Sequence, residues 1–277
     1  QGEEDLFILF ITRNSLETAK IIGYKKYMEP NQRGLLTHFK TRKSEKQKDP
    51  LASFQSQSYK AYEILLSRVL DNHPDTISHL IIIPDGIWSR IPFEALITEE
   101  KSGDTYADLP YLIRRYSVQY GYSAADFLRV QPTGRRASGI LAVAPIMFPY
   151  LPPEMNLPET EEEVDMILED WAGSALKREG ANRLNVQKKM GDYQVLHVAT
   201  HTSGYGNDQL SLPHMILRDE VLTVEDIYTL HTEADMVILS HCDVLEGEYT
   251  QGEGVEGIAR AFQYIGAPSL VTSLWPV

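Results

Sequence analysis

The stretch V-L-H-V-A-T-H-T-S-G, residues 195 to 204, decides the fold class of this chain. Apart from His197, residues 195–199 are apolar, and they lead directly into polar residues, which is typical of a buried strand. The stretch D-M-V-I-L-S-H-C-D-V, residues 235 to 244, shows the same pattern, because the apolar residues 236–239 lead directly into polar ones. We therefore expect two strands of one sheet that each end in a polar turn.

Outward from these two strands, predicted strands and helices alternate. The sequence predicts a strand at 140–144, a helix that begins within 158–164, a helix at 253–265 and a last strand at 270–274. The first of these helices has a predicted capping box and an apolar stripe. The box is formed by Thr160 and Glu163, and the stripe by Val164, Ile167, Leu168 and Trp171. This alternation predicts an α/β fold in which helices cover both faces of a mostly parallel sheet.

The first half of the chain is predicted to form an α/β lobe of its own. Its expected elements are strands at 6–11 and 80–83, the second of them buried on both faces, a polar loop at 31–50, a helix through 59–70 and an apolar segment at 116–120. Gln131 to Arg136 is the best candidate linker. We therefore expect an N-terminal lobe at 1–130 and a second lobe at 131–277 that is truncated at its C-terminal end.

Composition narrows the class of protein. Hydrophobic residues make up 43% and charged residues 23% of the 277 residues, as in ordinary globular proteins. The net charge of −13 argues against nonspecific binding of nucleic acid, which needs a basic surface. No apolar run approaches the roughly 20 residues that cross a bilayer. The chain begins Q-G-E-E-D, without an initiator Met or a signal peptide, so we expect an excised fragment. Nothing in it suggests export and its single cysteine suits a reducing compartment, so we expect a cytoplasmic protein.

A histidine and the only cysteine follow the two central strands. The carboxyl ends of parallel strands form the usual site of such sheets, so His201 and Cys242 are expected at one edge. A thiol becomes a good nucleophile when a nearby imidazole takes its proton. His241 is a weaker candidate because successive side chains on a strand diverge, and His197 lies inside its strand. An inert buried thiol remains the alternative from spacing alone.

His197 and His201 also have the spacing of a helical zinc pair. His201 comes four positions after His197, but the apolar residues between and before them predict a strand, and the glutamate of such zinc motifs is missing. The acidic cluster 159–163 is interpreted as charge at a helix start, which the helix dipole favours. We therefore expect neither a metal nor another cofactor.

Several ordered motifs resemble those of one family. They are I-P-F-E-A-L at 91, L-P-E-T-E-E-E-V at 157, V-L-H-V-A-T-H at 195, L-T-V-E-D-I-Y at 222, A-D-M-V-I-L-S-H-C-D-V at 234 and G-E-G-V-E-G-I-A-R-A-F-Q-Y-I-G-A-P-S-L-V-T-S-L-W-P-V at 252. Together these motifs resemble the CHAT family of caspase-like peptidases, which is related more distantly to caspases and separase. The resemblance spans nearly all of the chain. It implies that the lobe at 131–277 is the caspase-like catalytic lobe and that the lobe at 1–130 is a pseudo-caspase half.

The resemblance implies a cysteine endopeptidase in which His201 and Cys242 are catalytic. It also implies an oxyanion hole formed by the backbone N–H groups of Thr202 and Cys242. The chain departs from the family pattern at Thr202, where a Gly is usual, and at His241, where a small residue is usual. An extended substrate is expected to add a strand beside the end of the last predicted strand. The expected substrate-binding residues are Asp243, Ser273, Leu274 and Trp275.

The expected partners are a protein substrate and an upstream sensing or repeat module, in a bacterial defence or signalling protein. Neither nucleic acid nor a membrane is expected as a direct partner. The acidic, Gly-rich segment 246–254 either favours a basic residue near the cleavage point or is a solvated loop. The alternatives to a peptidase are a catalytically inactive caspase-like scaffold and a hydrolase of small acyl or amide substrates.

Overall fold

The computed structural model describes residues 5–40, 49–73, 77–100, 103–125, 137–203, 213–240, 248–250 and 254–273. The chain divides into two compact units, residues 1–121 and 122–277, which are described separately below. Among the described residues, no helix is both long enough and apolar enough to span a bilayer.

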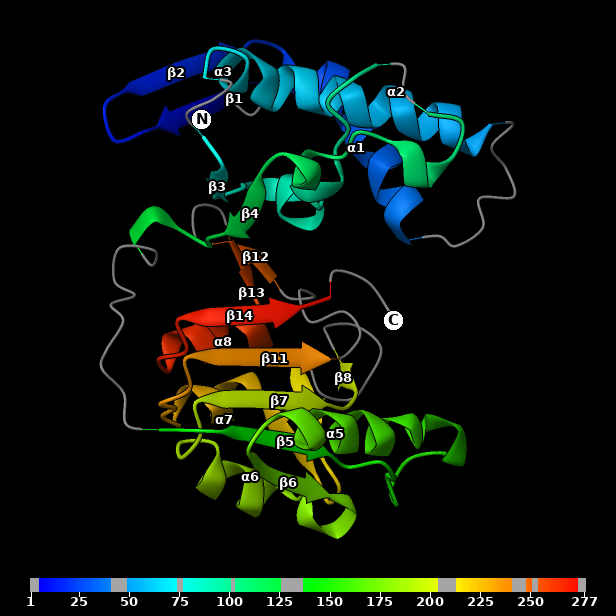
Figure 1. Ribbon diagram of the computed structural model, residues 1–277, viewed down its shortest axis with the longest axis vertical. Helices are drawn as coiled ribbons and strands as arrows, with labels where there is room; N and C mark the ends of the chain where they lie inside the picture. The colour runs from blue at the N-terminus through cyan, green and yellow to red at the C-terminus, as the bar shows by residue number, and fades with distance from the viewer. Residues whose placement is uncertain are drawn as a thin grey trace. The chain divides into compact units, whose positions relative to one another are not determined.

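The second unit is built around a five-stranded sheet. Its strand order is β14-β11-β7-β5-β6, and every neighbouring pair is parallel. Figure 1 shows the five arrows in this order, with all arrowheads on the same side. The strands are β5 (Ile140–Ala144), β6 (Gly173–Lys177), β7 (Val195–Ala199), β11 (Met236–Ser240) and β14 (Ser269–Thr272). The predicted strands are confirmed, with the last one shifted toward the N-terminus.

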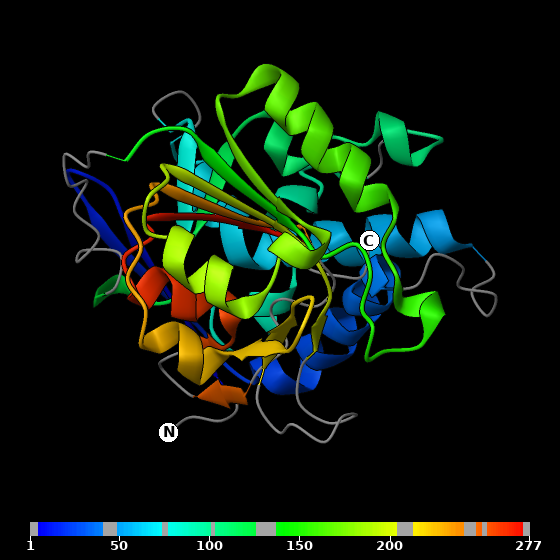
Figure 2. The same cartoon turned by 90° about the horizontal axis from the view of Figure 1, so that it is seen from below.

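Helices cover both faces of this sheet (Figure 2). On one face, Ala142 and Ala144 of β5 pack with Val164 of α5 (Glu159–Asp170). On the other face, alternate residues such as Leu196 and Val198 join a larger apolar core. That core includes residues of α6 (Arg183–Lys189), α7 (Val224–Tyr228) and α8 (Ile258–Tyr264). The predicted α/β fold with a mostly parallel sheet is therefore confirmed.

Shorter elements connect the strands of the second unit. A three-stranded antiparallel sheet follows β7, in the order β10-β9-β8, and β12 pairs with β13. Two short 3-10 helices, at Pro153–Met155 and Arg178–Gly180, precede α5 and follow β6. The strands are β8 (Thr202–Ser203), β9 (His214–Ile216), β10 (Val221–Thr223), β12 (Glu248–Thr250) and β13 (Gly254–Glu256).

Two helix predictions in this unit are wrong in detail. The N-cap residue of α5 is Pro158 and makes no side-chain cap, while the Thr160 hydroxyl donates to the Leu157 carbonyl. Trp171 lies beyond the end of α5 and is 59% exposed, so it does not extend the apolar stripe. The last helix begins at Ile258 and not at residue 253, because the residues just before it form β13.

The first unit combines a hairpin, helices and a small parallel sheet. β1 and β2 form an antiparallel pair, and β3 and β4 form a parallel pair. A π-helical turn at Glu63–Ser67 joins α2 to α3 within one continuous helical stretch, as the apolar spacing predicts. The elements are β1 (Leu6–Ile11), β2 (Leu16–Ile21), α1 (Tyr24–Lys40), α2 (Pro50–Tyr62), α3 (Arg68–Leu70), β3 (His79–Ile82) and β4 (Ser117–Tyr120).

Two predictions for the first unit are wrong. Residues 31–40 are helical and not a loop, because α1 buries Leu35 and Met28 in the core of this unit. β3 is not buried on both faces, since Ile81 is 42% exposed while Leu80 is buried. The segment I-P-F-E-A-L contributes buried Ile91, Phe93 and Leu96 to the same core. The predicted linker at 131–136 lies outside the described residues.

At the start of β6, one added methyl group is expected to destabilise the second unit. A Cβ on Gly173 would lie 2.1 Å from the carbonyl oxygen of Ile140, its partner in β5. Gly173→Ala should therefore lower the free energy of unfolding by about 1–3 kcal/mol, because the two strand backbones must separate. Gly180→Ala is the matched control, since a Cβ there meets nothing within 4 Å. Equal midpoints of urea unfolding for the two variants would contradict this prediction.

Candidate active site

The candidate site lies at the carboxyl ends of β7 and β11, which are neighbours in the sheet. Their register pairs Ala199 with Ser240. His201 and Cys242 each stand two residues beyond that pair in the sequence, because 201 − 199 and 242 − 240 are equal. Cys242 itself lies outside the described residues, whereas His201 is described and half-buried.

The ring of His201 is held by a backbone group and an aromatic ring. Its Nε2 lies 2.7 Å from the carbonyl oxygen of Met155. Since a carbonyl can only accept, Nε2 donates, and in the neutral ring the lone pair is on Nδ1. The ring of Phe148 lies 5.3 Å from that of His201, measured between centroids. This arrangement leaves Nδ1 as the nitrogen that can take a proton.

The backbone around His201 is fixed by the strand that follows it. The carbonyl of His201 accepts a hydrogen bond of 2.9 Å from the N–H of Ile216. The hydroxyl of buried Thr200 donates to the carbonyl of the same Ile216. On the other side, Thr202 pairs with Met215 between β8 and β9. Residues of β9 therefore bond to the backbone or side chain of Thr200, His201 and Thr202, and so fix the turn after β7 on both sides of the histidine.

The segment that supplies the Met155 carbonyl is closed by its own hydrogen bonds. The N–H of Leu157 donates to the Ile146 carbonyl at 2.8 Å, and the N–H of Phe148 donates to Oδ1 of Asn156 at 3.0 Å. Ile146 has a positive φ of 66°, a backbone conformation that β-branched residues rarely adopt. Its side chain is buried, so packing holds the turn that directs this segment toward His201.

His197 takes a different partner from His201. Its side chain is buried in β7, and its Nε2 lies 2.8 Å from Oε1 of Glu163 on α5. Glu163 therefore links its helix to β7, in place of the predicted capping box. Within the ranges that the structure describes, no group of three or more His, Cys, Asp and Glu side chains could hold a metal ion.

The other predicted site residues divide between the described and undescribed parts of the chain. Thr202 opens β8, directly after His201. Ser273 follows β14, the terminal strand of the five-stranded sheet, and is half-buried. Cys242, Asp243, Leu274 and Trp275 lie outside the described residues. The roles predicted for all six residues, the oxyanion hole included, stay predictions.

Sequence reasoning missed the groups that orient His201. Met155 contributes through its backbone carbonyl, which no side-chain pattern reveals. Phe148 contributes its ring. Its position in the loop after β5 could have indicated this role, because the loops at the carboxyl edge of an α/β sheet line the site. These contacts now give His201 a defined orientation that the sequence alone did not.

Comparison with known proteins identifies the family. A search of curated proteins found no match to the chain. The model of the CHAT domain matches residues 55–277, which is most of the chain and includes the whole five-stranded sheet. The resemblance seen in the motifs is thereby confirmed, and the chain belongs to the CHAT domain family, a family related to the caspase-like cysteine peptidases.

Proposed function

We propose that this protein is a cysteine endopeptidase in which Cys242 is the nucleophile and His201 the general base and acid. The observation that carries the proposal is the oriented ring of His201 beside β11, the strand that leads to Cys242. Adjacent strands lie about 4.8 Å apart. In the sequence, His201 and Cys242 each stand two positions after the paired residues Ala199 and Ser240. The family assignment supports the same pair of residues.

The proposed reaction is acyl transfer through a thioester. Nδ1 of His201 takes the thiol proton of Cys242 as the sulfur attacks a peptide carbonyl, while the Met155 carbonyl continues to accept from Nε2. The imidazolium then gives its proton to the leaving amine. A water molecule, deprotonated by the same ring, attacks the thioester and releases the acid. The N–H groups of Thr202 and Cys242 are proposed to stabilise the oxyanion.

The substrate is proposed to bind as an extended strand next to β14. This strand is bonded to β11 on one side and ends the five-stranded sheet on the other. A terminal strand offers backbone N–H and C=O groups to an added strand. We propose that Ser273, Leu274 and Trp275 form this edge and that Asp243 contributes to the specificity pocket.

We further propose a regulated enzyme of a bacterial defence or signalling protein. Its partners would be a protein substrate and a sensing or repeat module upstream of this chain, in the cytoplasm. The physical reason is that an unrestrained endopeptidase would damage its own cell.

Alkylation of the thiol tests the proposal without a known substrate. Because Cys242 is the only cysteine, the rate of labelling by iodoacetamide reports this one atom. An unperturbed thiol, with a pKa of about 8.5, is only a few per cent ionised at pH 7. We expect the His201→Ala variant to react about 10-fold more slowly than the wild type at pH 7.

The His197→Gln variant is the matched control for this experiment, since His197 is bonded to Glu163 and not to the loop that orients His201. It should leave the labelling rate within about 2-fold of the wild type. Slow labelling of the wild type, unchanged by His201→Ala, would instead identify a noncatalytic caspase-like scaffold.

A further inference from the structure

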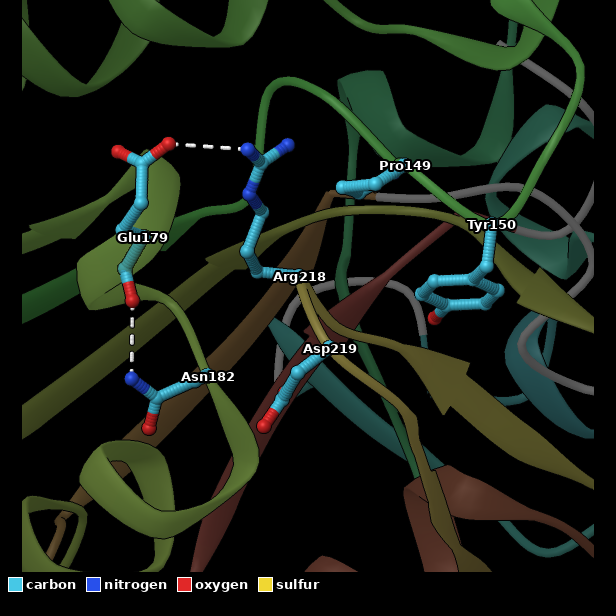
Figure 3. Close-up of a pocket in the computed structure, with 6 residues that line it drawn as sticks. All are labelled: Pro149, Tyr150, Glu179, Asn182, Arg218 and Asp219. Carbon is cyan, nitrogen blue, oxygen red and sulfur yellow. Dashed lines mark hydrogen bonds and ion pairs between the residues drawn. The ribbon is translucent and has the colours of Figure 1, made fainter.

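An open groove of about 520 Å³ lies in the second unit (Figure 3). Its residues come from the segments that follow β5, β6 and β9, and from the start of α6. They are Pro149, Tyr150, Glu179, Asn182, Arg218 and Asp219.

Two polar side chains of the groove are occupied by bonds within the protein. The guanidinium of Arg218 donates to the Met147 carbonyl at 2.8 Å and to Oε1 of Glu179 at 2.9 Å. The amide of Asn182 donates to the Glu179 carbonyl, and its oxygen accepts from the N–H of Asn185. Figure 3 shows the contacts of Glu179 with both side chains. The positive charge of Arg218 is therefore balanced by a carboxylate.

Asp219 adds a negative charge to the same groove. Its Oδ1 accepts from the backbone N–H of Arg183 at 2.9 Å, and within the described residues no cationic side chain forms an ion pair with it. Tyr150 is fixed by its hydroxyl, which donates to the Leu217 carbonyl at 2.7 Å. The pKa of Tyr150 is raised to about 12, first by burial and then by the negative charges of Asp219 and Glu220.

A carboxylate beside an aromatic ring suits an organic cation. The carboxylate accepts charge-assisted hydrogen bonds, while the ring attracts a cation to its face and Pro149 offers apolar contact to an alkyl stem. Lysine and arginine side chains have this combination of an apolar stem and a charged end. The lining thus favours a basic side chain over an acidic or purely apolar one.

The groove lies close to His201 along two separate segments. Phe148 contacts the His201 ring, and the next two residues line the groove. Ile216 donates to the His201 carbonyl, and Arg218 follows two residues later. At about 3.3 Å per extended residue, the groove begins within roughly 10 Å of the histidine. It belongs to the β5 and β6 side of β7, whereas β11, which leads to Cys242, is on the other side.

We infer that this groove binds a lysine or arginine side chain of the substrate, about two to four residues after the scissile bond. The inference rests on the proposed function, in which His201 protonates the leaving amine. That amine begins the C-terminal part of the substrate, which must therefore lie on the histidine side of the thiol. An extended peptide covers about 10 Å in three residues, so its third residue after the bond reaches the groove.

Digestion of a proteome-derived peptide mixture tests this inference. Mass spectrometry of the products gives the residues before and after each cut for the wild type, Asp219→Asn and Glu169→Gln. Glu169→Gln removes one exposed charge from α5, away from the groove lining, and controls for net charge. We expect basic residues to be enriched two to four positions after the cut. Asp219→Asn should reduce that enrichment about 5-fold and leave the residues before the cut unchanged.

Anisotropy measurements keep the inference testable if no peptide is cut, which would overturn the proposed function alone. Two fluorescein-labelled peptides, of alternating Ala and Lys or of alternating Ala and Gln, are titrated with the Cys242→Ala protein. The Lys peptide should bind at least about 5-fold more tightly, and Asp219→Asn should remove most of this difference. Equal affinities of the two peptides, or equal losses in Asp219→Asn and Glu169→Gln, would overturn the inference.

Discussion

Replacing His201 by alanine is expected to lower kcat/KM for peptide cleavage by about 10³- to 10⁴-fold. In the proposed mechanism, loss of the ring deprives the thiol of Cys242 of its base and the leaving amine of its proton donor. The effect should exceed that of any substitution in the groove that is proposed to bind a basic side chain, because both proton transfers of the proposed mechanism use the same nitrogen. The measurement is the initial rate on a peptide that the wild type cleaves, at substrate concentrations well below KM.

Three further variants make this result specific. Cys242→Ala should remove cleavage to the same background, and the double variant should be no slower than either single one, because the two groups act as a unit. His231→Ala is the control, since His231 is an exposed histidine of the same unit that precedes β11, whereas the candidate site lies at the carboxyl end of that strand. A loss below about 10-fold in His201→Ala would exclude His201 as the base.

The strand assignments could be predicted because local pattern and tertiary environment agree. Residues 140–144 are apolar throughout and residues 195–199 are apolar except for His197, and the structure buries both faces of β5 and β7 under helices. The choice of His201 over His197 also follows from the strand, because one residue lies beyond its end and the other within it. These predictions needed only the alternation of side chains and the rule for the edge of a parallel sheet.

The capping box at α5 failed because a distant residue competes for the same side chain. Thr160 and Glu163 have the right spacing, but Glu163 bonds to His197 of β7 and Thr160 donates to the Leu157 carbonyl. The spacing of residues in the sequence indicates which hydrogen bonds can form within a helix turn. It does not indicate whether a side chain from another element will bind the same group instead. The helical residues 31–40 show the same effect, since Leu35 is buried by contacts made across its unit.

The orientation of His201 could not be predicted because it depends on loop backbone. The Met155 carbonyl is placed by hydrogen bonds between Ile146 and Leu157 and between Phe148 and Asn156. None of these bonds needs a distinctive residue except the asparagine. The groove that is proposed to bind a basic side chain depends on the same loop, so orientation of the histidine and recognition of the substrate are linked by one segment.

Phe262→Ala is expected to lower the free energy of unfolding by about 3–5 kcal/mol. Phe262 on α8 is among the largest fully buried side chains, and it lies in the same core as Val237 and Leu239 of β11. Its loss removes apolar contacts and leaves a cavity beneath the strand that leads to Cys242. Hydrogen exchange of the β7 and β11 amides under native conditions would measure the loss for this unit alone.

Tyr264→Ala, two residues further along α8, separates burial from the loss of an aromatic residue. Tyr264 is 74% exposed and makes an edge-to-face contact with Tyr228 at 5.1 Å between centroids. Such a pair contributes about 0.5–1.5 kcal/mol, so this variant should lose no more than that. If both variants accelerate exchange in β7 and β11 equally, α8 does not pack on the sheet through Phe262. If only Phe262→Ala does so, the strands that lead to His201 and Cys242 depend on this helix for their stability.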